Sequence, residues 1–219
     1  GNTGLIAMPE GTVYADKLNE VFRQMKEKDM YKEMVVYIEA CFSGSMFRNI
    51  LQDDIKLYAT TAANHLESSY AAYCGFEAVA EGQNIGSCLG DEYSVNWMED
   101  SDEQPRRTVQ EQFQLVKAKT QGSHVQEFGD EKVAQQSIWK FQGSKKSNSM
   151  EDMYEEMFGS LPEINDEEHE FHGIKSEDAK LDYLYHRTLV NSDTKAQLDF
   201  SAELNHRIRV DHEFKSFER

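Results

Sequence analysis

The sequence predicts an α/β fold with a mostly parallel sheet flanked by helices, and three observations carry this prediction. Apolar residues recur at intervals of three and four between residues 16 and 28, which is typical of an amphipathic helix. Residues 34–38 and 56–62 form short apolar runs, like the buried strands of parallel sheets. The order of strand, small polar loop, connection and second strand is typical of α/β proteins.

The elements that follow carry shorter signals. Residues 108–120 are predicted to form a helix with one apolar side, and residues 125–128 and 137–141 are predicted to form short strands. The polar run at residues 144–149 indicates a domain edge.

Charge divides the chain into two parts. Lys and Arg number 23 against 40 Asp and Glu, which gives a net charge of −17, whereas nucleic-acid-binding proteins are usually basic. Eleven acidic residues and one basic residue lie between residues 151 and 178. Residues 147–178 are therefore predicted to be an acidic linker, with an electrostatic docking strip as the alternative. No apolar run reaches the roughly 20 residues that span a bilayer.

Beyond the acidic stretch, residues 179–190 and 194–217 are predicted to be helical. The residues expected to form a buried face of these helices are Tyr183, Leu184, Leu189, Leu198, Ala202 and Ile208.

The three cysteines fall into two groups. Cys41 lies at the carboxyl end of a predicted buried strand, where chemistry is located in parallel sheets. The small residues Ser43, Gly44 and Ser45 follow it and leave backbone N–H groups free to stabilise an oxyanion, so Cys41 is a candidate nucleophile. Cys74 and Cys88 flank a glycine-containing loop, and they either close a disulfide or remain ordinary small apolar residues.

A cysteine nucleophile requires a base, for which an imidazole is the usual choice. His65 follows the second predicted strand and His124 lies in a loop, but no motif marks either of them, or any of the other five histidines, as that base. The sequence contains no zinc-binding or phosphate-loop motif, so neither a metal nor a cofactor is expected.

Six segments are informative because of their order. They are GNTG at residues 1–4, YIEACFSGSM at 37–46, YATTAAN at 58–64, ESSYA at 67–71, LGDEYSVNWMEDSD at 89–102 and FQGSKK at 141–146. This set resembles the legumain family, the haemoglobinase-type asparaginyl endopeptidases, which are cysteine proteases with a caspase-like fold. The resemblance assigns residues 1–146 to the C-terminal part of the catalytic domain. Residues 179–219 resemble, more weakly, the beginning of the helical C-terminal prodomain.

The resemblance implies a set of site residues. Cys41 corresponds to the nucleophile, and Gly1 to the residue whose backbone N–H forms the oxyanion hole together with that of Cys41. Glu39, Ser69 and Asp91 correspond to the pocket for the substrate Asn, whose primary amide offers both donors and an acceptor. The family's catalytic His directly precedes the position of Gly1, and its supporting Asn and pocket Arg also lie upstream. This fragment alone is therefore expected to be inactive.

Two features depart from the family pattern. Phe42 stands where the family usually has Glu, and an apolar residue there is expected to affect pH dependence or substrate contacts. The loop at residues 75–88 is longer than in relatives, which is expected to reshape the subsites beside the pocket. In the tail, Asn191 corresponds to the maturation cleavage site that releases the prodomain at acidic pH; the alternative is a helix cap before Ser192.

The implied activity is that of a cysteine endopeptidase that cleaves after Asn, and less readily after Asp, through a thioester intermediate. The alternatives are a transamidase of the lipid-anchor-attaching type and a non-catalytic pseudo-protease. The expected partners are peptides or proteins with Asn at the cleaved bond, the protein's own prodomain as an inhibitor and cystatin-type inhibitors, but no nucleic acid. The implied location is the lysosome or vacuole, or outside the cell, with a signal peptide upstream of this fragment.

Overall fold

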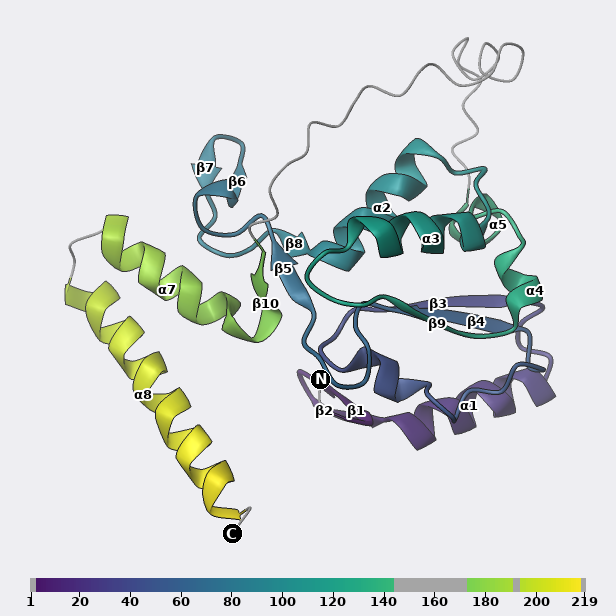
Figure 1. Cartoon of the computed structure of the whole chain (residues 1–219), viewed down its shortest axis with the longest axis horizontal. Helices are drawn as coiled ribbons and strands as arrows, with labels where there is room; N and C mark the ends of the chain where they lie inside the picture. Colours follow the sequence, from purple (N-terminus) through teal and green to yellow (C-terminus); the bar gives the residue numbers. More distant parts are fainter. Residues whose placement is uncertain (1–2, 144–172, 191–193, 218–219) are drawn as a thin grey trace.

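The computed structural model describes residues 3–143, 173–190 and 194–217 (Figure 1). Helices cover both faces of a small central sheet, as predicted for an α/β fold, and a pair of helices lies to one side of it. Within these described ranges, no helix combines the length and the apolar character that crossing a membrane requires.

The central sheet has the strand order β3 (Met34–Ile38), β4 (Leu57–Thr61) and β9 (Gln126–Gly129). β3 and β4 are parallel, with Val36 opposite Ala59, so the predicted parallel pair is confirmed. β9 pairs with β4 in the antiparallel direction. All five residues of β4 are buried, which explains why its sequence is a continuous run of small and apolar side chains.

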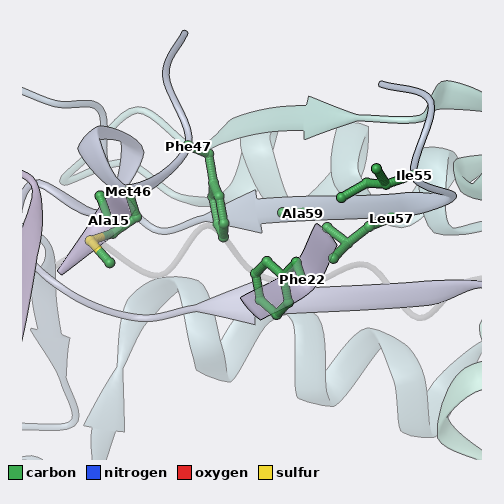
Figure 2. Packing of buried hydrophobic residues seen from close by; sticks show 7 residues of the cluster. All are labelled: Ala15, Phe22, Met46, Phe47, Ile55, Leu57 and Ala59. Carbon is green, nitrogen blue, oxygen red and sulfur yellow. The ribbon is translucent and has the colours of Figure 1, made fainter. Parts of the chain in front are cut away.

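Helices pack on the two faces of this sheet. α1 (Ala15–Glu27) covers one face, while α2 (Glu92–Glu103) and α3 (Val109–Lys119) cover the other (Figure 1). On the second face, Tyr93 of α2 packs with Phe113 of α3. The buried core on the α1 side comprises Ala15, Phe22, Met46, Phe47, Ile55, Leu57 and Ala59 (Figure 2).

A second, smaller sheet lies beside the carboxyl end of the central one. Its order is β10 (Ile174–Lys175), β5 (Tyr70–Ala72) and β8 (Gly90–Asp91), and both pairings are antiparallel. The other short elements are the hairpin of β1 (Leu5–Met8) with β2 (Gly11–Tyr14), the hairpin of β6 (Val79–Ala80) with β7 (Gln83–Asn84), the 3-10 turns η1 (Ser43–Met46), η2 (Gly75–Glu77) and η3 (Ser176–Asp178), and the helices α4 (Glu131–Ala134) and α5 (Trp139–Gln142).

The strand predicted at residues 137–141 is wrong. Ser137 makes only an isolated bridge to Thr108, and the chain then turns into α5. Ile138 is buried against Tyr58. Its carbonyl accepts two hydrogen bonds, from the N–H of Phe141 at 2.9 Å and from the N–H of Gln142 at 3.0 Å. These local bonds satisfy the backbone that a strand ladder would otherwise have to pair.

The two C-terminal helices agree with the prediction, but their buried face does not. α7 (Ala179–Val190) and α8 (Thr194–Phe217) pack together, with the rings of Tyr185 and Phe200 5.9 Å apart. Of the six residues assigned to the buried face, Leu184 is buried and Tyr183 is partly buried. The other four are exposed because each helix uses only one side for the contact; they are Leu189, Leu198, Ala202 and Ile208.

The predicted acidic linker, residues 147–178, is described only at its end. Its residues 147–172 lie outside the described residues. Residues 174–178, however, form β10 and η3, and β10 is hydrogen-bonded to the central strand of the small sheet. This part of the acidic stretch is therefore packed against the candidate site.

Candidate active site

Cys41 follows β3 at the carboxyl end of the central sheet, as the sequence predicted. It is a free thiol and is only 7% exposed. The next residue, Phe42, has φ +59°, and its N–H donates to the Glu67 carbonyl at 2.7 Å. The chain can then turn tightly because Gly44 lies against Ala63: its N–H donates to that carbonyl at 2.9 Å, and an added Cβ would stand 3.0 Å from the same oxygen.

The structure brings Cys41 together with two of the predicted pocket residues. Its Sγ lies 3.8 Å from the Ser69 hydroxyl. That hydroxyl is 3.3 Å from the Ser176 hydroxyl, which donates to Asp91 at 3.0 Å. A chain of contacts therefore runs from Cys41 through Ser69 and Ser176 to Asp91.

Glu39 directly follows β3 and lies two residues before Cys41. Its Oε2 accepts the backbone N–H of Ser94 at 3.2 Å and the Ser94 hydroxyl at 3.1 Å. Its Oε1 is buried and has no hydrogen-bond partner among the described residues.

The pKa values of two carboxyl groups in the site, Glu39 and Asp91, are raised, which favours the protonated form. Burial, reinforced by the negative charge of Asp91, raises the pKa of Glu39 to about 7, and the nearby Ser94 and Ser69 hydroxyls oppose this shift. Burial also raises the pKa of Asp91, against the hydrogen bond from Ser176. Such shifts are typical of functional clusters because a buried charge without a cationic partner is costly.

Gly1, the predicted oxyanion residue, lies outside the described residues. The segment that follows it does reach the site: the Gly4 N–H donates to the Ser45 hydroxyl at 2.7 Å. Ser45 belongs to η1, directly after the Cys41 turn. The segment at Gly4 is thereby tied to the turn that follows Cys41.

The two candidate histidines near the sheet edge have other partners. His124 Nδ1 lies 2.7 Å from the Glu67 carboxylate, and His65 contacts the guanidinium of Arg48. In the described part of the chain, no histidine forms a hydrogen bond with the Cys41 thiol. Neither His65 nor His124 is therefore assigned as the base.

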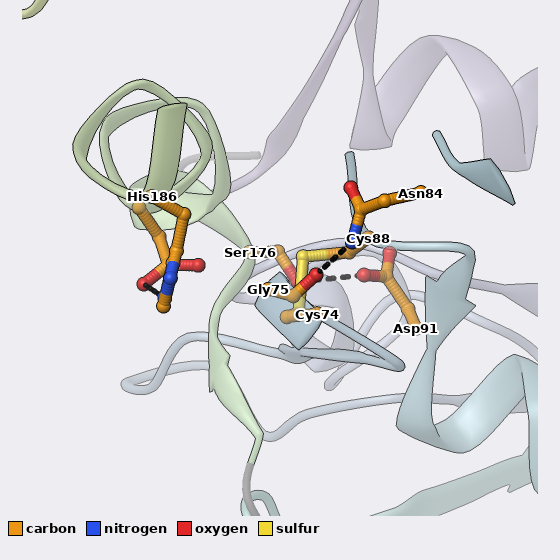
Figure 3. The surroundings of a disulfide bond; sticks show 8 residues. Cys74, Gly75, Asn84, Cys88, Asp91, Ser176 and His186 are labelled. Carbon is orange, nitrogen blue, oxygen red and sulfur yellow. Dashed lines mark hydrogen bonds and ion pairs between the residues drawn. A yellow bond between two sulfur atoms is a disulfide. The ribbon is translucent and has the colours of Figure 1, made fainter. Parts of the chain in front are cut away.

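Of the two states left open for the remaining cysteines, the structure has the disulfide between Cys74 and Cys88 (Figure 3). The bond closes the long loop that was noted as a departure from the family pattern. Inside the loop, the Asn84 side chain donates to the Gly75 carbonyl at 2.7 Å. The disulfide connects the loop directly to the small sheet, since β5 ends two residues before Cys74.

Three residues of the site were missed from the sequence. Ser94 lies in the recognised LGDEYSVNWMEDSD segment, but its partner Glu39 is 55 residues away in the chain. Ser176 lies in the acidic stretch, where charge obscured a short strand. Glu67 accepts backbone N–H groups from Asn64 at 2.9 Å and His124 at 2.8 Å, and it carries no signal beyond its place in a matching segment.

Comparison with known proteins agrees with this geometry. The sequence profile of the peptidase C13 family matches residues 1–144. Legumain from Mus musculus is 47% identical over 147 residues, which cover 66% of this chain and 32% of the relative. The vacuolar-processing enzyme from Vicia sativa is 39% identical over 168 residues, which cover 74% and 34%. The hemoglobinase from Schistosoma japonicum is 40% identical over 153 residues, which cover 69% and 35%.

These matches confirm the resemblance drawn from the six sequence segments. The chain spans about a third of the length of the relatives it matches.

Proposed function

Since the chain belongs to the peptidase C13 family, we propose that the protein containing it is a cysteine endopeptidase that cleaves after Asn, and less readily after Asp. The observation that carries the proposal is the chain of contacts that joins the buried free thiol of Cys41 to Ser69 and, through Ser176, to Asp91. These groups lie at the carboxyl end of two parallel strands. The thiol is suited to acyl transfer, and the polar side chains are suited to recognition of a polar substrate side chain.

In the proposed reaction, the Cys41 thiolate attacks the carbonyl carbon of the scissile bond. The C–N bond then breaks, the amine leaves with a proton from the catalytic imidazole, and the resulting thioester is hydrolysed by water. We assign the imidazole to the histidine that the family carries immediately before the position of Gly1. The backbone N–H groups of Gly1 and Cys41 form the oxyanion hole, and the hydrogen bond from Gly4 to Ser45 supports this by holding the segment near the nucleophile turn.

The proposed substrate pocket consists of Glu39, Ser69 and Asp91. An Asn side chain has an amide NH₂ that donates to carboxylate or hydroxyl oxygens, and a carbonyl that needs a donor. The unpaired Oε1 of Glu39 supports a role as an acceptor for the NH₂ group. An Asp side chain supplies no such donor unless it is protonated, which is consistent with slower cleavage after Asp.

The protein's own C-terminal region is the proposed inhibitor. β10 pairs with β5 in the manner of a bound extended peptide, and the Ser176 hydroxyl contacts Ser69 and Asp91. The Ser176 N–H also donates to the Ser69 carbonyl at 3.0 Å. Asn191, outside the described residues between α7 and α8, is the proposed processing site.

The same cluster is the proposed target of cystatin-type inhibitors. A lysosomal, vacuolar or secreted location is proposed for the protein, and the name of the Vicia sativa relative, a vacuolar-processing enzyme, supports the vacuolar option.

The test uses a full-length protein that contains this chain, incubated at about pH 4 to 5 to protonate carboxylates that hold the inhibitory region. Cleavage of a peptide with Asn at the scissile position is measured beside matched peptides with Asp and Gln. Activity is expected on Asn, weaker activity on Asp, and a loss of about a thousandfold or more in Cys41→Ala.

Three outcomes would contradict the proposal. One is equal cleavage of the three peptides, another is activity that persists in Cys41→Ala, and the third is no cleavage by a folded, processed protein. In the third case, transfer of the acyl group to an added amine would identify a transamidase. Phe42→Glu restores the usual family residue and is compared with the wild type. If only this variant cleaves the Asn peptide, the wild type is a pseudo-protease.

A further inference from the structure

We propose that Ser94 is a positioning residue for substrate specificity: it holds one oxygen of Glu39 and leaves the other oxygen for the substrate side chain. The inference rests on the proposed function, in which Glu39 contacts the substrate Asn. Ser94 itself does not contact the reacting atoms and acts only through Glu39.

The geometry fixes the carboxylate in an asymmetric arrangement. Ser94 lies in the first turn of α2, where backbone N–H groups have no partner within the helix. Its N–H and its hydroxyl both donate to Oε2 of Glu39, at 3.2 and 3.1 Å. Oε1 is buried and unpaired among the described residues, so it is the oxygen that remains available to an incoming amide.

The first turn of α2 is rigid enough to act as this support. The buried Glu92 carboxylate accepts the backbone N–H groups of Gln121 at 2.6 Å and Gly122 at 2.9 Å. The Tyr93 hydroxyl is 2.6 Å from the Thr60 hydroxyl on β4. Because the two residues before Ser94 are anchored to other elements, Ser94 cannot follow a rotation of the Glu39 carboxylate.

The hydrogen bonds also favour the charged form of Glu39. Burial and the charge of Asp91 raise the pKa of Glu39, and Tyr93 also interacts with it. The Ser94 donors act in the opposite direction, as do the Ser69 hydroxyl and the positive end of the α2 dipole. Charged Glu39 accepts the NH₂ of Asn, whereas an Asp substrate gains nothing from that charge. Ser94 therefore favours Asn over Asp.

The first arm of the test measures specificity in the full-length protein. Ser94→Ala is expected to lower kcat/KM for the Asn peptide by about tenfold at pH 6 to 7, with a smaller effect on the Asp peptide, because one hydrogen bond to a charged group is lost. Ser94→Thr keeps the hydroxyl and should restore the preference. Ser101→Ala, in the same helix with its hydroxyl on the Trp97 carbonyl, is the control for general damage to α2.

The second arm measures the support directly in the 219-residue chain. The Glu39 carboxyl is titrated by NMR with ¹³C-labelled Glu and assigned with Glu39→Gln. Ser94→Ala is expected to increase its proton affinity by about threefold to tenfold, while Ser101→Ala leaves it unchanged. Spectral dispersion and the denaturation midpoint verify that each variant is folded.

The two arms separate failure of this inference from failure of the proposed function. A wild type that does not cleave the Asn peptide overturns the proposed function, and the titration still tests the Ser94 contact. An active wild type whose Asn preference is unchanged in Ser94→Ala overturns the inference. Equal losses on Asn and Asp with an unchanged Glu39 titration also overturn it, because they indicate a merely structural role.

Discussion

At the scale of single residues, the turn after Cys41 depends on backbone contacts more than on side-chain identity. Phe42 adopts the left-handed conformation, which costs a non-glycine residue about 1 kcal/mol. The hydrogen bond from its N–H to the Glu67 carbonyl offsets that cost, and any residue except proline can supply it. Phe42, at the position where the resemblance led us to expect Glu, is therefore compatible with the turn after Cys41.

Glu39 gives a prediction about stability. Its pKa rises from 4.5 to about 7 on folding, mainly through burial, so the unfolded chain loses this proton first as the pH rises. The protonated Glu39 therefore contributes at most about 3 kcal/mol to the free energy of unfolding. This contribution is fully present below about pH 4.5 and is lost as the pH rises to 7. Glu39→Gln should remove this dependence.

The measurement is chemical denaturation of the 219-residue chain at several pH values between about 4 and 8, with the free energy of unfolding of the variant subtracted from that of the wild type. Glu10→Gln, an exposed residue between β1 and β2, is the matched control. A wild-type-minus-variant difference that stays constant, or rises with pH, would contradict the assignment.

At the scale of elements, the helices and strands that were predicted from the sequence are those that bury apolar side chains. The runs at residues 34–38 and 56–62 were found because β3 and β4 pack between layers of helices. α2 was missed because its buried residues include Glu92 and Asp100, which carry charge and leave no apolar stripe. Glu92 is satisfied by Gln121 and Gly122, and Asp100 by Gln112 and Arg107, contacts that no local pattern encodes.

The candidate site divides in the same way. Cys41 was predicted from its place at the carboxyl end of a strand, and Glu39, Ser69 and Asp91 were predicted because they lie in segments that match a family in order. Ser176 was not, because its contact with Asp91 joins residues 85 positions apart and β10 is only two residues long. Periodicity cannot reveal a strand of that length.

β10 gives a prediction about access to the thiol. Ser176→Pro removes the N–H that donates to the Ser69 carbonyl, and it also removes the hydroxyl contacts to Ser69 and Asp91. With about 1 kcal/mol lost per hydrogen bond, opening of this strand should increase the rate of Cys41 alkylation by at least about tenfold.

The reaction with iodoacetamide is followed by mass spectrometry, which reports on Cys41 alone while Cys74 and Cys88 remain bonded. Ser176→Ala keeps the N–H and should give an intermediate rate. Identical rates in the three proteins would show that β10 does not shield the thiol.

At the scale of the whole molecule, the disulfide-closed loop connects the catalytic part to the C-terminal helices. His186 of α7 lies against Gly75, and its ring meets Phe76 edge-on with centroids 5.1 Å apart. Tyr183 of α7 lies against Gly86 in the same loop. Because β10 leads directly into η3 and α7, this contact fixes the helix that follows β10.

Two glycines of the loop allow the contribution of this contact to be isolated. Gly86 and Gly82 have φ +72° and +76°, so an alanine causes similar backbone strain at either position. A Cβ on Gly86 would stand 2.3 Å from the Tyr183 ring, whereas one on Gly82 would meet no atom within 4 Å. Gly86→Ala should therefore displace α7 and increase amide hydrogen exchange along it by about tenfold, while Gly82→Ala should leave α7 as in the wild type. An equal increase in amide hydrogen exchange along α7 in both variants would mean that backbone strain in the loop, and not the clash with Tyr183, displaces α7. Unchanged exchange in Gly86→Ala would mean that the loop does not hold α7 and that the β10 pairing with β5 suffices to keep the C-terminal helices in place.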